Sequence, residues 1–271
     1  MKLILALALF LSSTILYSPA KVIAQIKQPT TSGQPTQATK KRPVFVWAKK
    51  PSRLSNISGR RVGMGSRNGR DDCLVVETPL IALVPFKERN LVNKQLNKST
   101  PIDVWGLTTE EHPTFWFYVP YIKNFANLSA EFVLQDQEEN DVYRHAIALR
   151  TTPGVIDVPL PSTVAPLQVG KIYRWYFKVY CYQQDQTIPP TYVEGDIQRV
   201  ILSSSEESQL AATDPREKIA IYAALGIWYD SLTILAQIYK ANPQDTSLAA
   251  DWQSLLQSIN LGNIATAPLV N

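Results

Sequence analysis

The sequence predicts a mainly β fold, an antiparallel immunoglobulin-like β-sandwich with a C-terminal α-helical hairpin. Two observations carry this prediction. Between residues 73 and 202, apolar and polar residues alternate in short segments bounded by turn signals, as in half-buried antiparallel strands. After residue 205 the apolar residues recur at steps of three and four, which is typical of amphipathic helices. We therefore expect a sandwich domain over residues 44–205 and a helical segment over 206–271 that packs on it.

Residues 1–24 have the layout of a secretory signal peptide. Lys2 provides a positive start, residues 3–16 form an apolar core of 14 residues, and Val22-Ile23-Ala24 offers a cleavage site before Gln25. A membrane-spanning helix needs about 20 apolar residues, and no Cys follows the core as a lipoprotein anchor would require. We expect export to the periplasm or the exterior, with an uncleaved N-terminal anchor as the alternative.

Residues 25–43 are rich in Gln, Pro, Thr and Ser and are expected to be a disordered basic tether. Residues 25–70 contain eleven Lys and Arg and no acidic residue, whereas residues 71–271 contain fourteen basic and twenty-three acidic residues. This basic arm could bind an envelope protein or polyanions of the envelope, such as acidic glycans or anionic lipid head groups. The alternative is that Arg60, Arg61 and Arg67 fold back on the acidic body as ordinary surface pairs.

Eight segments have the length and alternation of strands. They are residues 73–77, 80–84, 115–119, 130–136, 142–149, 155–159, 172–182 and 192–202, with residues 44–47 as an earlier candidate. The alternation is clearest in the seventh segment, where Tyr173, Trp175 and Phe177 share one face with Cys181. Such alternation favours two packed sheets with an apolar interior.

Two helices are expected after residue 205. Asp214-Pro215-Arg216-Glu217 is a helix start, with a capping residue, a proline at the first position and an acidic first turn. The apolar residues that follow form a stripe on one helix face that ends at Asn242-Pro243: Ile221, Leu225, Trp228, Leu232, Leu235 and Tyr239. A second helix is predicted over residues 246–259, with Gly262 just past its end. We expect the first stripe to join the core of the sandwich.

Cys73 and Cys181 are the two cysteines of the sequence. In an oxidising compartment a single pair is most simply one disulfide, and two buried free thiols are the alternative.

Aromatic residues lie on both faces of two predicted strands. Trp116 and Tyr118 face away from Phe115 and Phe117, and Tyr176 and Tyr180 face away from Trp175. Trp116, Tyr118, Tyr176 and Tyr180 are thus the candidate ligand-binding residues, because exposed aromatic rings stack on sugars or contact a partner peptide. The alternative is that the C-terminal helices cover this second face.

Three motifs of the sequence are distinctive: Pro113-Thr114-Phe115-Trp116-Phe117-Tyr118-Val119-Pro120, Gly170-Lys171-Ile172-Tyr173-Arg174-Trp175, and Trp228-Tyr229-Asp230-Ser231-Leu232. They resemble motifs of a cyanobacterial family of exported proteins, the domain of unknown function nine-hundred-twenty-eight. The resemblance covers about residues 57–270, and family members carry a Cys near positions 73 and 181; the loop Gly63-Met64-Gly65 departs from the glycine-richer form of the family. The resemblance implies a fold and a compartment and brings no activity.

Catalytic signatures are few. The sequence has no Gly-x-Ser-x-Gly elbow, Walker loop or His-Glu-x-x-His helix. Glu110-Glu111-His112 could hold a metal weakly, but acids in a loop are usually just solvated, and His145 is expected in a core or boundary position. We expect no cofactor, resident metal, catalytic group, nucleic-acid partner or transmembrane span in the mature chain. The sequence favours a non-catalytic binding or structural module of the cell envelope over a glycan-directed or cell-wall enzyme.

Overall fold

The computed structural model describes residues 42–46, 59–63, 76–89, 102–123, 128–181 and 190–270. The expected signal peptide, nearly all of the basic tether, and Cys73 lie outside these residues. None of the helices in the described segments has the length and apolarity that a membrane crossing requires.

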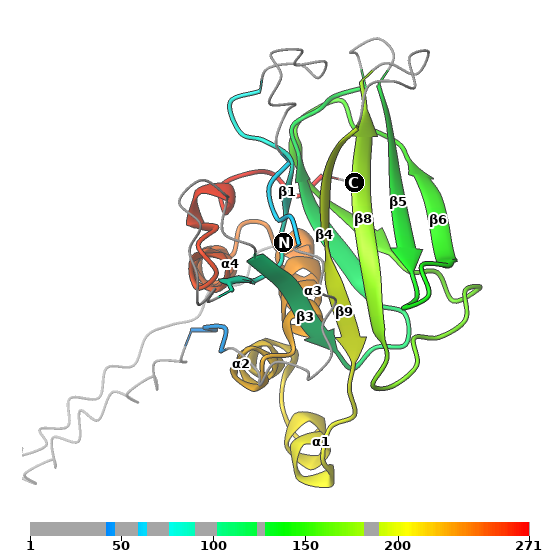
Figure 1. Ribbon diagram of the computed structural model, residues 1–271. Coiled ribbons are helices and arrows are strands. Elements are labelled where there is room, and N and C mark those ends of the chain that lie inside the picture. The colour runs from blue at the N-terminus through cyan, green and yellow to red at the C-terminus, as the bar shows by residue number, and fades with distance from the viewer. Residues whose placement is uncertain are drawn as a thin grey trace, which may run out of the picture. The chain divides into compact units, whose positions relative to one another are not determined.

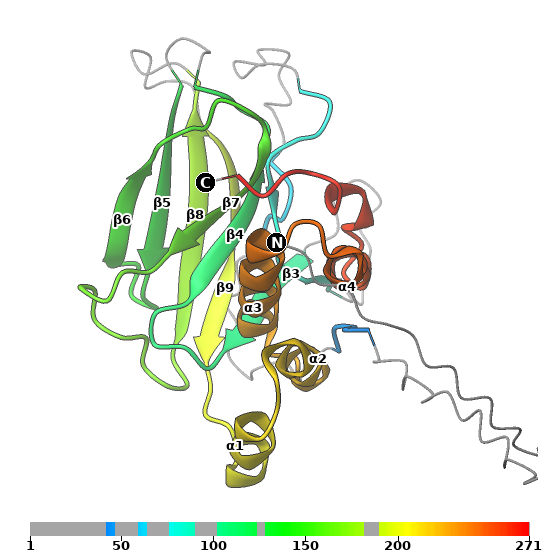
Figure 2. The same cartoon turned by 180° about the vertical axis from the view of Figure 1, so that it is seen from behind.

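The described residues form a mainly β structure of two sheets followed by four α-helices. The smaller sheet has the strand order β1-β4-β7 and the larger one β2-β3-β9-β8-β5-β6. The strands are β1 (Ile81–Ala82), β2 (Phe86–Glu88), β3 (Ile102–Thr108), β4 (Thr114–Val119), β5 (Ser129–Gln135), β6 (Asp141–Ile147), β7 (Gly154–Pro159), β8 (Ile172–Tyr180) and β9 (Thr191–Arg199). Figures 1 and 2 show the larger sheet with the smaller sheet and α3 on one of its faces. Two sheets are thus confirmed, while an immunoglobulin-like strand arrangement stays a prediction.

The strand predictions differ from the structure at several places, including β2, where no strand was expected. Residues 102–108, for which no strand was expected, form β3, because a strand that is buried on both faces shows no alternation. β3 pairs with β9 in parallel, with Trp105 opposite Asp196, so the expectation of purely antiparallel pairing is wrong for this pair. Residues 44–46 and 76–77 lie outside strands.

The helical part contains more than the expected hairpin. It consists of α1 (Ser204–Ala211), α2 (Pro215–Leu225), α3 (Trp228–Ala241) and α4 (Thr246–Gln257), followed by a short 3₁₀ turn at Gly262–Ile264. The single helix expected from Pro215 to Tyr239 divides at Gly226, which has a φ of 75°. This left-handed residue ends α2 through an Ile227 N–H to Tyr222 carbonyl hydrogen bond of 2.9 Å. The redirected chain carries α3 onto the sheets.

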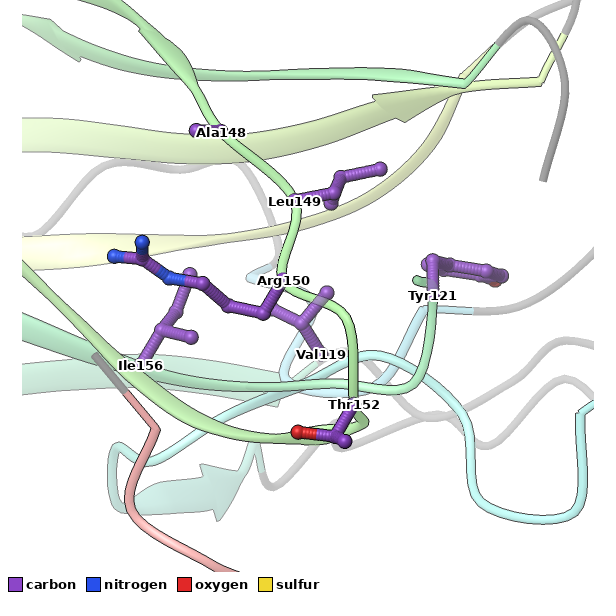
Figure 3. Close-up of a pocket in the computed structure, with 7 residues that line it drawn as sticks. All are labelled: Val119, Tyr121, Ala148, Leu149, Arg150, Thr152 and Ile156. Atoms are coloured by element: carbon purple, nitrogen blue, oxygen red, sulfur yellow. The ribbon is translucent and has the colours of Figure 1, made fainter. Parts of the chain in front are cut away.

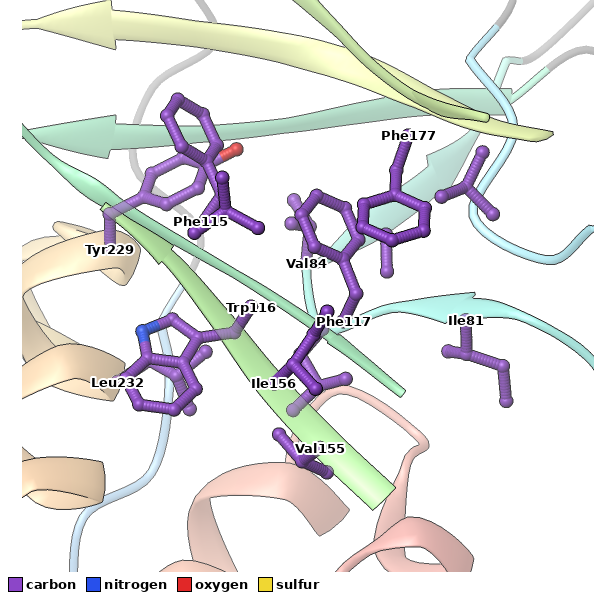
Figure 4. Packing of buried hydrophobic residues seen from close by; sticks show 14 of the residues in the cluster. Ile81, Val84, Phe115, Trp116, Phe117, Val155, Ile156, Phe177, Tyr229 and Leu232 are labelled. Atoms are coloured by element: carbon purple, nitrogen blue, oxygen red, sulfur yellow. The ribbon is translucent and has the colours of Figure 1, made fainter. Parts of the chain in front are cut away.

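The core lies between the two sheets and continues under α3 and α4. The rings of Phe117 and Phe177, from opposite sheets, have centroids 4.6 Å apart (Figure 4). The ring centroids of Phe115 and Phe132 are 4.7 Å apart. Trp228, Leu232 and Leu235 belong to this same cluster, as the helical stripe predicts. Ile221 and Leu225 do not: Ile221 is half-buried, and Leu225 packs on a smaller cluster around Trp105, Leu107 and Ile227.

Two tryptophan N–H groups fix α3 on the sheets. Trp175 Nε1 in β8 donates to the Tyr229 hydroxyl at 2.8 Å, and Trp228 Nε1 donates to the Leu83 carbonyl at 2.7 Å. The helix approaches β3 so closely that a Cβ on Gly106 would lie 2.9 Å from the Tyr229 ring. This contact places the first turn of α3 against the end of β3.

Candidate functional site

A cavity of about 260 Å³ lies between the N-terminal half of α3 and the loop that joins β3 to β4. Three of its lining residues are buried: Thr108 from the end of β3, and Tyr229 and Asp230 from the first turn of α3. Glu110 and Gln237 lie at its exposed rim. The lining is completed by His112, Pro113, Thr114, Thr233 and Ile234.

Asp230 is the central side chain of this cavity and is only 4% exposed. Its carboxylate accepts a hydrogen bond from the Thr109 N–H at 3.0 Å and a second, very short one from the Thr109 hydroxyl. The Thr108 hydroxyl is a further hydrogen-bond partner. These neutral donors hold the carboxylate in one orientation between the loop and the helix.

Burial raises the pKa of Asp230 from its ordinary value of 3.8 to about 6, against the opposing effect of the Thr108 and Thr109 hydrogen bonds. The negative charge of Glu110 raises the pKa further. Asp230 therefore remains mostly ionised at neutral pH and becomes protonated under mildly acidic conditions.

The loop that forms one wall of the cavity is fixed from its far side. Arg199, at the end of β9, donates from Nε to the Thr109 carbonyl at 3.2 Å and forms an ion pair with Glu111 at 3.0 Å. His112 Nε2 donates to the Val164 carbonyl at 2.9 Å. Since these contacts hold the loop in place, the cavity exists before any ligand enters.

The walls of the cavity are polar. They carry two carboxylates, three threonine hydroxyls, one amide and one imidazole, and no Lys or Arg is among the residues that line it. The described segments contain no group of three or more His, Cys, Asp or Glu side chains that could hold a metal ion. The arrangement is suited to a small molecule that donates hydrogen bonds.

A second set of charges lies on the face of the larger sheet that points away from the core. Arg174 in β8 contacts Glu194 at 3.3 Å and Asp196 at 3.4 Å, and all three side chains are buried. Burial raises the pKa of Asp196 to about 6 and also raises that of Glu194, while Arg174 opposes both effects. This network is a structural ion cluster rather than an open site.

The four predicted ligand-binding residues lie on two different sheets. Trp116 and Tyr118 belong to β4 and Tyr176 and Tyr180 to β8. Trp116 is 2% exposed, and its Nε1 donates to the Thr233 hydroxyl of α3 at 3.0 Å. The four residues therefore do not form one continuous face.

Tyr176 and Tyr180 are half-buried on the outer face of the larger sheet, among charged side chains. The Tyr180 hydroxyl donates to Glu131 at 2.7 Å, and this carboxylate also pairs with Arg144 at 2.7 Å. Lys178 Nζ lies 5.2 Å from the centre of the Tyr176 ring.

The cysteines and the basic arm are described only in part. Cys181 is buried, and its expected partner Cys73 lies outside the described residues, so the disulfide stays a prediction.

Arg60 stacks over the Tyr192 ring at 4.3 Å, and Arg61 is buried and donates to the Ile259 carbonyl at 2.6 Å. Both side chains contact the body, but neither contact is the surface ion pair with an acidic residue that the alternative interpretation describes, and Arg67 lies outside the described segments.

A further depression is lined by Val119, Tyr121, Leu149, Arg150 and Ile156, together with Ala148 and Thr152 (Figure 3). It has no interior volume that would admit a water molecule. We therefore place the candidate site at the Asp230 cavity.

The sequence alone did not single out Asp230, Thr108 or Thr109. One signal was present: Asp230 is the single charged residue between Lys218 and Lys240. Its partner Thr109 is 121 positions earlier in the chain, so only the fold brings the two together. His112 and Glu110, considered as weak metal ligands, do line the cavity.

No curated protein matches this sequence. The model of a family described as Domain of Unknown Function (DUF928) matches residues 62–269. This match spans both sheets and all four α-helices, including the cavity. The chain therefore belongs to the family Domain of Unknown Function (DUF928).

Proposed function

We propose that the chain is an exported, non-catalytic binding module of the cell envelope, and that it holds a small polar ligand in the Asp230 cavity. The observation that carries this proposal is the cavity itself, which is about 260 Å³ in volume and polar at its base. Ligand pockets begin at about 300 Å³, so a molecule smaller than a typical drug would fit. Export rests on the signal-peptide layout of residues 1–24.

Two structural features support binding by a preformed site. The loop wall is held by Arg199 and His112, and the helix wall is held by the Trp175–Tyr229 hydrogen bond. A site that is already ordered loses little conformational entropy when a ligand enters.

The test is a thermal-unfolding screen of sugars, amino acids and amines, with a variant whose cavity mouth is blocked. In Gln237→Trp, an indole replaces an exposed amide at the rim, and Ala241→Trp adds the same group at an exposed position of the same helix outside the cavity. A true ligand raises the unfolding temperature of the wild-type protein and of Ala241→Trp but not of Gln237→Trp. A screen without any such compound would contradict the proposal.

Localisation is tested separately. The full chain with a C-terminal epitope tag should be recovered from the periplasm or the medium, shortened by about 24 residues at its N-terminus. Recovery of the uncleaved chain from the cytoplasm would contradict export and leave the cavity proposal standing.

A glycan-directed or cell-wall enzyme is the second candidate, and one observation favours it. The cavity is lined by two carboxylates, and burial raises the pKa of Asp230 to about 6, as in a general acid. Hydrolysis of cell-wall fragments or glycosides by the wild-type protein, abolished in Glu110→Gln, would establish this function and overturn the non-catalytic one.

A further inference from the structure

Five carboxylates are buried in the described part of the chain: Asp103, Glu194, Asp196, Asp230 and Asp251. Burial removes a carboxylate from the water that stabilises its charge. Buried acids in folded proteins are therefore normally paired with a base or bound to a metal ion.

Four of these five carboxylates form an ion pair with an arginine. Arg89 lies 2.5 Å from Asp103, Arg174 lies 3.3 Å from Glu194 and 3.4 Å from Asp196, and Arg216 lies 2.6 Å from Asp251. Each of these four buried carboxylates is thus paired with the positive charge of an arginine.

Asp230 differs from the other four. Among the described residues it forms no ion pair, and the donors that contact it, Thr108 and Thr109, are neutral. Arg199, which holds the neighbouring loop, is engaged with Glu111 and with two backbone carbonyls instead. Asp230 is also the buried carboxylate that lines the cavity.

We propose that the cavity binds a small organic ammonium ion whose protonated nitrogen pairs with Asp230. This inference rests on the proposed function, because it names the chemical class of the ligand that the cavity holds. The ligand's charge takes the place that an arginine has at each of the other buried carboxylates.

The rest of the lining fits such a ligand. Glu110 adds a second negative charge at the rim, and no lining residue is a Lys or Arg that would repel a cation. The hydroxyls of Thr114 and Thr233 can accept hydrogen bonds, and Ile234 offers an apolar contact for methylene groups. An anion would meet two carboxylates in the same space, so the lining selects against it.

The experiment compares aminohexanol with hexanediol by isothermal titration calorimetry at neutral pH. The two probes have the same length, and one hydroxyl in hexanediol replaces the protonated amine. The proteins are the wild type, Asp230→Asn and the control Asp245→Asn, which makes the same substitution at an exposed position of the α4 N-cap. We expect the wild type and the control to prefer aminohexanol by roughly tenfold or more, the usual contribution of a hydrogen bond to a charged group.

Asp230→Asn should lose this preference and bind the two probes about equally. Persistence of the preference in Asp230→Asn would overturn the inference. If Asp230→Asn fails to fold, Glu110→Gln serves as the second variant, and a reduced preference is expected there because one of the two negative charges is removed.

Other outcomes separate the inference from the proposed function. Equal binding of both probes by the wild type would refute the charge requirement while leaving a ligand-binding cavity. Binding of neither probe at about 10 mM, which corresponds to a free energy weaker than about −3 kcal/mol, would contradict both. The last probe is Nα-acetyl-lysine amide, which keeps the ε-ammonium group and stands for a lysine residue of a partner protein. Binding of this probe but not of aminohexanol would indicate that the cavity binds a lysine side chain of another protein, and it would overturn the small-molecule ligand.

Discussion

The substitution Asp230→Asn should change the pH dependence of stability in a defined direction. In the folded protein the pKa of Asp230 rises from 3.8 to about 6 because the carboxyl is buried. A raised pKa means that the folded state binds the proton more tightly than the unfolded state. The contribution of the protonated carboxyl is therefore complete below about pH 4 and is lost as the pH rises through about 6.

The size of this loss follows from the shift. A rise of the pKa from 3.8 to about 6 lowers the free energy of unfolding by about 3 kcal/mol between pH values below the first pKa and pH values above the second. Asparagine cannot ionise, and its side-chain oxygen can still accept the hydrogen bonds from Thr109. Relative to the wild type, Asp230→Asn should therefore become more stable by about 3 kcal/mol between pH 4 and about pH 8.

The assay is urea unfolding of both proteins at intervals across this pH range. Asp196, whose pKa is also raised to about 6, contributes equally to both proteins and cancels in the difference. Asp245→Asn is the control, and its pH dependence should have the opposite sign. Hydrogen bonds from Ser247 lower the pKa of Asp245, so the stability that ionised Asp245 contributes is lost as the pH falls. If the free energies of unfolding of the wild type and of Asp230→Asn differ by the same amount at all pH values, Asp230 is not a buried carboxyl with a raised pKa.

Three further changes test the fold that builds the cavity. Trp228→Ala should destabilise the protein by about 3–5 kcal/mol in urea unfolding, because Trp228 is 0% exposed, and a loss under about 1 kcal/mol would contradict its place in the core. Arg174→Leu should cost about 3–5 kcal/mol at neutral pH, since it leaves Glu194 and Asp196 without their shared partner, and this cost should shrink as the pH falls. Gly226→Ala should cost about 1 kcal/mol through its left-handed backbone, whereas an unchanged midpoint would indicate a continuous helix.

The sequence predicted the parts of the fold that local patterns encode. The second half of β8 alternates because one of its faces is in the core, and Asp214-Pro215 indicates the start of α2. β3 was missed because it is buried on both faces, and its parallel partner β9 is about ninety residues away. The break at Gly226 was missed because the apolar stripe continues across it. A single glycine within a helical pattern does not reveal whether tertiary packing will use it to end the helix.

The candidate site depends on contacts between residues that are far apart in the sequence. Trp116 contacts α3, more than a hundred residues later, as expected if the C-terminal helices cover the second aromatic face. Asp230 acquires its properties only from long-range contacts with Thr109 and from burial. The spacing of residues along the chain reveals neither the contacts of Asp230 with Thr109 nor its burial.

The most direct test of this account is the pKa of Asp230 measured by carbon NMR of its carboxyl group, with and without saturating aminohexanol. The side chains of Glu110, His112, Tyr222 and Tyr229 lie around Asp230, so the resonance of Asp230 itself must be followed. We predict a pKa of about 6 in the free protein and a fall of at least about 1 unit with aminohexanol, the shift that tenfold coupling between ionisation and binding requires. An Asp230 pKa that is the same with and without aminohexanol would contradict the account.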